Sequence, residues 1–81
     1  MEKRYIAVIK EIGGSFYGCL PDFTLSCTEV SREAVVEKLL RMANCFVSSV
    51  STQLVIPSTT SENVIRGKWD GWYIETVLIN I

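Results

Sequence analysis

One stretch of the chain, residues 31 to 50, constrains the fold most because its apolar residues recur at intervals of three and four. This period is typical of an α-helix with one apolar face. The residues on that face are Val35, Val36, Leu39, Leu40, Ala43, Phe46, Val47 and Val50. Ser31 is a suitable N-cap, and Glu37 precedes Arg41 by four residues on the polar face, a spacing that favours an ion pair. Since no second helix of comparable strength is evident, strands must cover the apolar face.

The segments before this helix predict a β-hairpin. Residues 5 to 12 are rich in β-branched side chains and end at Gly13-Gly14, which favours a two-residue turn into a second strand, residues 15 to 20. We expect one face of the hairpin to carry Ile6, Val8, Ile12, Phe16, Gly18 and Leu20, and the other to carry Tyr5, Ala7, Ile9, Tyr17 and Cys19. Because both faces are fairly apolar, we expect the helix on one and a partner chain on part of the other.

The rest of the chain predicts two further strands. Pro21-Asp22 interrupts the strand pattern, residues 24 to 29 alternate as a third strand, and residues 72 to 81 have the strongest strand signal. Between the helix and the last strand, residues 57 to 71 are dense in turn formers and are predicted to form a loop, and loops of this length are often functional. The predicted fold is therefore α+β, in the order β-β-β-α-β, with one small, mainly antiparallel sheet and a single helix packed on one face.

Composition limits the partners and the compartment. A chain of 81 residues with 48% hydrophobic residues predicts a single domain over residues 1 to 81, and its small size favours a homo-oligomer, a dimer or a tetramer. The net charge of -1 and the lack of a basic cluster longer than Lys3-Arg4 argue against direct nucleic acid binding. Without a signal sequence or a membrane span, the chain is predicted to be cytoplasmic. The three cysteines have neither metal nor disulfide spacing and are expected to be buried free thiols.

The residues suited to catalysis are sparse. The chain has no histidine, the commonest general base and metal ligand. Its carboxylates Asp22, Glu29, Asp70 and Glu75 occur singly in predicted turns and strands, where capping or solvated roles are expected. A magnesium-dependent nuclease would need two or more of these acids close together on the sheet. We therefore predict no enzymatic activity, no cofactor and no metal.

Aromatic residues gather near the end of the predicted loop. Trp69, Trp72 and Tyr73 surround Asp70-Gly71, a composition frequent in protein interfaces. The same residues could instead close the end of the hydrophobic core. The small basic and aromatic group of Arg66, Lys68 and Trp69 is too limited to indicate nucleic acid binding.

Several short motifs occur in the order found in a known family. They are Leu20-Pro21-Asp22-Phe23, then Cys27, then Glu33-Ala34 at the start of the helix, then Val55-Ile56-Pro57-Ser58, and a closing strand over residues 73 to 81. The sequence resembles HicB, the antitoxin of a bacterial toxin-antitoxin pair. It departs from the family in having Thr24-Leu25-Ser26 before the cysteine in place of a segment with Pro-Gly, and in the segment from Gly67 to Gly71.

The resemblance implies a partial RNase H-like fold without catalytic carboxylates. It also implies binding to HicA, a small toxin that cleaves mRNA, and masking of its active site. The resemblance leads us to expect Asp22 as a surface contact for this partner, and composition adds Phe23, Trp69, Asp70 and Trp72. Many HicB proteins carry a DNA-binding domain after this one, and no such C-terminal domain is predicted here. The alternative is a stand-alone homo-oligomeric HicB-like domain, orphan or phage-borne, with an unknown partner.

Overall fold

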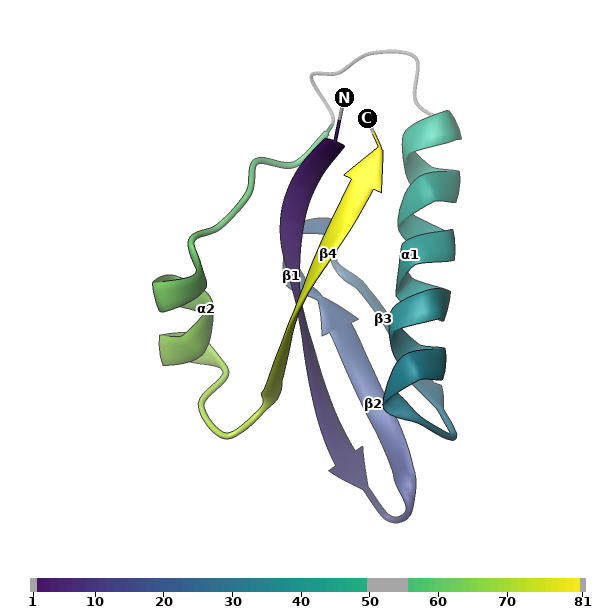
Figure 1. Ribbon diagram of the computed structural model, residues 1–81, viewed down its shortest axis with the longest axis vertical. Coiled ribbons are helices and arrows are strands. Elements are labelled where there is room, and N and C mark those ends of the chain that lie inside the picture. The colour runs from purple at the N-terminus through teal and green to yellow at the C-terminus, as the bar shows by residue number, and fades with distance from the viewer. Residues whose placement is uncertain (1, 50–55, 81) are drawn as a thin grey trace.

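The computed structural model describes residues 2–49 and 56–80, which form a four-stranded sheet with a helix on each face (Figure 1). The elements in chain order are strand β1 (Glu2–Ile12), strand β2 (Ser15–Leu20), the 3₁₀ turn η1 (Pro21–Phe23), strand β3 (Leu25–Glu29), helix α1 (Arg32–Ser49), helix α2 (Glu62–Lys68) and strand β4 (Tyr73–Asn80). Three residues used in the sequence predictions lie outside the described residues. They are Val50 at the predicted end of the helix, Val55 in the motif that precedes Pro57, and Ile81 at the predicted end of the last strand.

The sheet is antiparallel throughout and has the order β3-β2-β1-β4. Strand β1 is central, with β2 on one side and β4 on the other, and β4 pairs with it from Glu2 opposite Asn80 to Ile9 opposite Tyr73. The hairpin between β1 and β2 turns at Gly13 (φ 57°) and Gly14 (φ 85°). Positive φ at both central residues matches the twist of the strands and favours glycine. The α+β prediction and its order of strands are confirmed.

The predicted assignment of hairpin side chains to faces is wrong. The two-residue turn places Ile12 opposite Ser15, which sets Ile9 opposite Gly18 and Val8 opposite Cys19. An even-numbered residue of β1 therefore pairs with an odd-numbered residue of β2, and paired residues share a face. Tyr5, Ala7 and Ile9 consequently lie on the same face as Phe16, Gly18 and Leu20, and not on the face of Tyr17 and Cys19 as expected.

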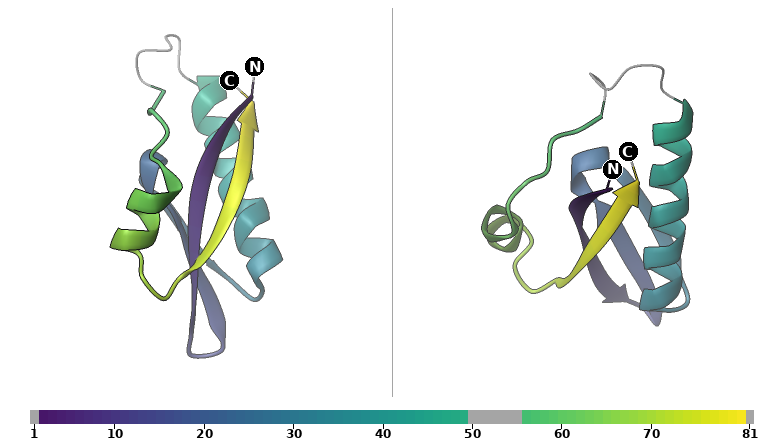
Figure 2. Two further views of the ribbon diagram at one scale, coloured as in Figure 1. Left: turned by 60° about the vertical axis from the view of Figure 1, so that its left-hand side comes forward. Right: turned by 45° about the horizontal axis from the view of Figure 1, so that its top comes forward.

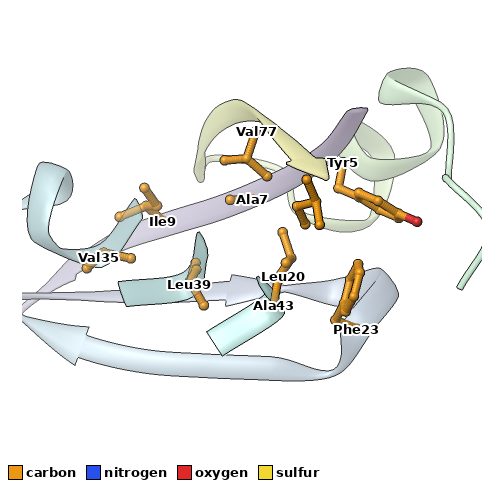
Figure 3. Packing of buried hydrophobic residues seen from close by; sticks show 10 residues of the cluster. Tyr5, Ala7, Ile9, Leu20, Phe23, Val35, Leu39, Ala43 and Val77 are labelled. Atoms are coloured by element: carbon orange, nitrogen blue, oxygen red, sulfur yellow. The ribbon is translucent and has the colours of Figure 1, made fainter. Parts of the chain in front are cut away.

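The main core lies between this face and α1. Its buried residues are Tyr5, Ala7, Ile9, Leu20, Phe23, Val35, Leu39, Ala43, Val77 and Ile79 (Figure 3). Helix α1 contributes every fourth residue to it, as the apolar period predicts. The Ser31 hydroxyl accepts a hydrogen bond from the Ala34 N–H at 3.1 Å, and Arg41 donates to Glu37 at 3.0 Å. The predicted cap and ion pair are both present.

A second, shorter helix occupies part of the region predicted to be a loop. Helix α2 lies on the face of the sheet opposite α1, as the two views of Figure 2 show. Its Ile65 is buried against Ile6 and Val8 of β1. The chain itself therefore covers part of the face for which a partner chain was expected. None of the helices within residues 2–49 and 56–80 has both the length and the apolar composition needed to cross a membrane.

Candidate protein-interaction surface

The face that α2 covers carries a cluster of half-buried aromatic and apolar side chains. Behind the buried Ile6, Val8 and Ile65, the partly exposed members of this cluster are Cys19, Trp69, Trp72 and Ile74. Both tryptophans come from residues 69–72, which join α2 to β4 and which we call the tryptophan turn. Half-buried aromatic side chains at the edge of an apolar cluster are a common feature of protein interfaces.

Backbone hydrogen bonds define the tryptophan turn. The Trp69 N–H donates to the Ile65 carbonyl at 2.8 Å, and the Trp72 N–H donates to the Trp69 carbonyl at 3.1 Å. Gly71 has a φ of 85°, in the left-handed region that favours glycine. The turn brings the two indole rings together edge to face, with centroids 4.9 Å apart.

Strands β1 and β2 hold Trp72 from the side of the sheet. The Tyr17 ring lies edge to face with Trp72 at 5.9 Å, and the Lys10 ammonium lies 5.6 Å from the centroid of the Trp72 ring. Both contacts depend on the hairpin register, which places Lys10 opposite Tyr17. Sequence reasoning missed Lys10 and Tyr17, since only the register reveals that they reach Trp72.

A shallow pocket of about 190 Å³ lies beside the tryptophan turn. Its lining residues are Arg66, Trp69, Asp70, Gly71, Trp72 and Ile74. Asp70 is exposed between the two half-buried tryptophans. Three of the five predicted contact residues, Trp69, Asp70 and Trp72, are thus brought together on one surface. This surface has mixed charge, because Arg66 and Lys10 lie close to the same aromatic group.

Asp22 has an internal role that the sequence did not indicate. One of its carboxylate oxygens accepts a hydrogen bond from the Thr60 N–H at 3.0 Å, and the other accepts one from the Thr60 hydroxyl at 2.5 Å. The Tyr5 hydroxyl adds a bond to the Pro57 carbonyl at 2.6 Å. Burial raises the pKa of Tyr5, and the negative charge of Asp22 raises it further. Asp22 therefore ties the segment before α2 to η1.

Phe23 is not a surface residue, and its prediction as a surface contact is wrong. The side chain is only 8% exposed. Its ring packs edge to face against Tyr5 at 4.8 Å (Figure 3). It also packs edge to face against Phe46 at 5.6 Å. Phe23 belongs to the core under α1, whereas the tryptophan turn lies on the other face of the sheet.

The cysteines differ in exposure. Cys19 and Cys27 are half-buried, whereas Cys45 is exposed on α1, so the expectation that all three are buried is wrong. The Cys27 thiol lies 3.8 Å from the Val35 carbonyl, to which it donates. Burial raises the pKa of Cys19. The pKa of Cys27 is also raised, by burial and by Glu29, against an opposing effect of Lys38. All three thiols are free.

The carboxylates do not form a metal site in the part of the chain that the structure describes. No three cysteine, aspartate or glutamate side chains there gather closely enough to hold an ion. Asp22 bonds to Thr60, Asp70 lies in the tryptophan turn and Glu75 lies on β4.

Comparison of this chain with protein-family models, with curated proteins and with solved structures finds no match.

Proposed function

We propose that this chain is a HicB-like antitoxin domain that binds a small HicA-type toxin and masks its mRNA-cleaving site by protein-protein contact. Two observations support the proposal. The chain has the HicB-like motif Leu20-Pro21-Asp22-Phe23 at the turn after the first hairpin. It also has the order of three strands, a long helix and a final strand that the resemblance implies.

The tryptophan turn is the observation on which the proposed contact rests. Trp69 and Trp72 are held against the sheet by Ile65 and Tyr17, so their exposed parts are already ordered before a partner arrives. Rigid aromatic anchors lose little conformational entropy on binding. The exposed Asp70 between them would meet a basic side chain of the toxin and fix the register of the complex.

The proposed activity requires no chemistry from this chain. Masking an active site needs a complementary surface that excludes the substrate, and the toxin supplies the only catalytic groups. We accordingly assign no cofactor, no metal and no direct contact with nucleic acid. Because its target would act on mRNA, we place the protein in the bacterial cytoplasm.

The proposal predicts that a small, basic, growth-inhibiting protein is encoded beside this chain, and that protein is the probe for the test. Co-expression should rescue the growth that this protein inhibits, and the two purified chains should bind in a calorimetric titration. Asp70→Lys should weaken binding by about tenfold or more, since it opposes a basic partner with a like charge. Glu11→Lys is the matched control, because Glu11 is exposed on the α1 face of β1, away from the tryptophan turn.

Failure of the two purified chains to associate would refute the antitoxin proposal. Equal losses of affinity for Asp70→Lys and Glu11→Lys would refute the proposed surface instead. The second candidate function is that of a stand-alone homo-oligomeric domain. It is favoured by strand β4, which lies at the edge of the sheet and pairs only with β1 among the described strands.

A further inference from the structure

Strand β4 forms one edge of the sheet. It pairs with β1 along its whole length, and its other side is not paired with any described strand. In an antiparallel ladder, alternate residues direct their N–H and C=O groups away from the neighbour, so this edge presents a row of donors and acceptors. We propose that β4 pairs antiparallel with β4 of a second copy of this chain, joining two four-stranded sheets into one continuous sheet in a two-fold symmetric dimer.

The features that normally block edge pairing are sparse on β4. Protected edges use proline, several charges, a bulge or a very short strand. Residues Tyr73–Asn80 contain no proline and a single charged residue, Glu75, and their register with β1 is unbroken over eight positions. The opposite edge differs. Strand β3 is only five residues long, follows Thr24 at a φ of 57° and ends at Glu29. The edge suited to pairing is therefore β4.

Symmetry restricts the register of such a dimer. A two-fold axis normal to the sheet keeps both copies of α1 on one face, and it pairs residues of β4 that share a face. The axis therefore lies between the two copies of one residue, which is opposite itself. An axis at Glu75 would oppose that carboxylate to its own copy, which is unfavourable. An axis at Thr76 aligns all residues from 73 to 79 with their counterparts.

An axis at Thr76 also brings exposed apolar side chains of β4 opposite apolar side chains of the second copy. On the α2 face, Leu78, which is 50% exposed, comes opposite the half-buried Ile74 of the second copy. On the α1 face, Tyr73, which is 52% exposed, comes opposite Ile79, which is already fully buried in the core under α1, so this pair adds little apolar burial. An axis at Val77 would oppose Leu78 to Thr76 and forfeit the first contact. The contact between Leu78 and Ile74, which the two-fold axis repeats on either side of Thr76, is the self-complementary feature that a symmetric interface requires.

The α1 side of this edge has room for the second copy. A groove of about 370 Å³ lies between α1 and β4 and is lined by Arg32, Glu33, Val36, Glu37, Leu40 and Glu75. Val36 and Leu40 are only partly covered there. The Arg32 guanidinium lies 4.3 Å from the centroid of the Tyr73 ring, which orders that ring at the edge. The dimer would place the α1-face side chains of the partner's β4 beside this groove.

Sedimentation equilibrium over a concentration series tests the dimer with the chain alone. The wild type should approach twice the monomer mass of 9.1 kDa. Thr76→Lys and Thr76→Glu should each raise the dissociation constant at least tenfold, because the axis opposes each new charge to its own copy. Mixing the two variants should restore a dimer, since the introduced ammonium of one copy then meets the introduced carboxylate of the other. Thr28→Lys on the exposed β3 edge is the matched control and should leave the dimer intact.

Three other outcomes of these experiments would each contradict the proposal. A wild type that stays monomeric, including one that uses β4 only to bind a different protein, would exclude the dimer. A mixture of the lysine and glutamate variants that stays monomeric would exclude the axis at Thr76. Equal dissociation by Thr28→Lys would exclude β4 as the interface. Recovery in the mixture shows at the same time that both variants are folded. The dimer does not depend on toxin binding.

Discussion

The side chain of Val35 lies directly against Gly18, so that a Cβ added at Gly18 would overlap the Val35 Cγ1. This close approach sets α1 onto the strand β2. A β-branched side chain has one strongly preferred rotamer in a helix, so moving the Val35 side chain away from Gly18 would cost free energy.

Gly18→Ala should therefore destabilise the fold by about 1–3 kcal/mol, because the added methyl overpacks the contact with Val35. Urea unfolding measures the change. Adding Val35→Ala should recover part of the loss, so that the double variant is more stable than the sum of the single changes predicts. Gly67→Ala is the control. Gly67 lies in α2 with open space around it and should gain about 0.5–1 kcal/mol. Additive single changes would contradict the contact.

The hydrogen bonds from Thr60 to Asp22 should hold the start of α2 against the sheet. Thr60→Ala removes the hydroxyl donor and should cost about 1 kcal/mol, as the bond is only partly buried. Hydrogen exchange should quicken in the amides of α2 more than in those of α1. Thr59→Ala, at an exposed neighbouring position, should change stability by less than about 0.5 kcal/mol. Equal exchange in both variants would show that the bond does not hold α2.

The Ser31 cap should contribute measurably to α1. Ser31→Ala removes the acceptor of the Ala34 N–H and should cost about 1 kcal/mol in urea unfolding. Ser31→Asp should retain most of the stability, because its carboxylate can accept the same bond. Ser48→Ala, at an exposed position in the last turn, should be close to neutral. Because alanine has a higher helix propensity than serine, a loss on Ser48→Ala equal to that on Ser31→Ala would show that the cap is not the cause of the effect.

Stability should fall at alkaline pH. The folded chain raises the pKa of Cys19 and Cys27 above 9.0 and that of Tyr5 above 10.0. Above these values the unfolded chain loses protons that the folded chain retains, which favours unfolding. The stabilising effect is complete below pH 9.0 and is lost as the pH rises through the folded pKa values. Urea midpoints under reducing conditions should show this fall, and a double Cys19→Ala, Cys27→Ala variant should show a smaller one. A pH-independent midpoint would contradict the prediction.

Local patterns in the sequence were sufficient for the elements with a strong period. The helix over Arg32–Ser49, its cap and its ion pair follow from residues three and four positions apart, and β2 follows from the Gly13-Gly14 turn. Helix α2 was missed because its seven residues are too few for a clear helical period, although Ser61 and the Glu62–Arg66 pair, which are 2.7 Å apart, mark it. The neighbours of Phe23 are turn formers, which made a surface position the natural expectation for this residue.

The sequence by itself determined the α+β class, the long helix and its apolar face, since these depend on interactions between near neighbours in the chain. Tertiary structure alone decided that Asp22 binds Thr60, that Lys10 and Tyr17 meet Trp72, and that Val35 requires a glycine at position 18. Each of these contacts joins different elements of the sheet and its helices. Strand register and helix placement bring them together, and no local period in the sequence encodes either.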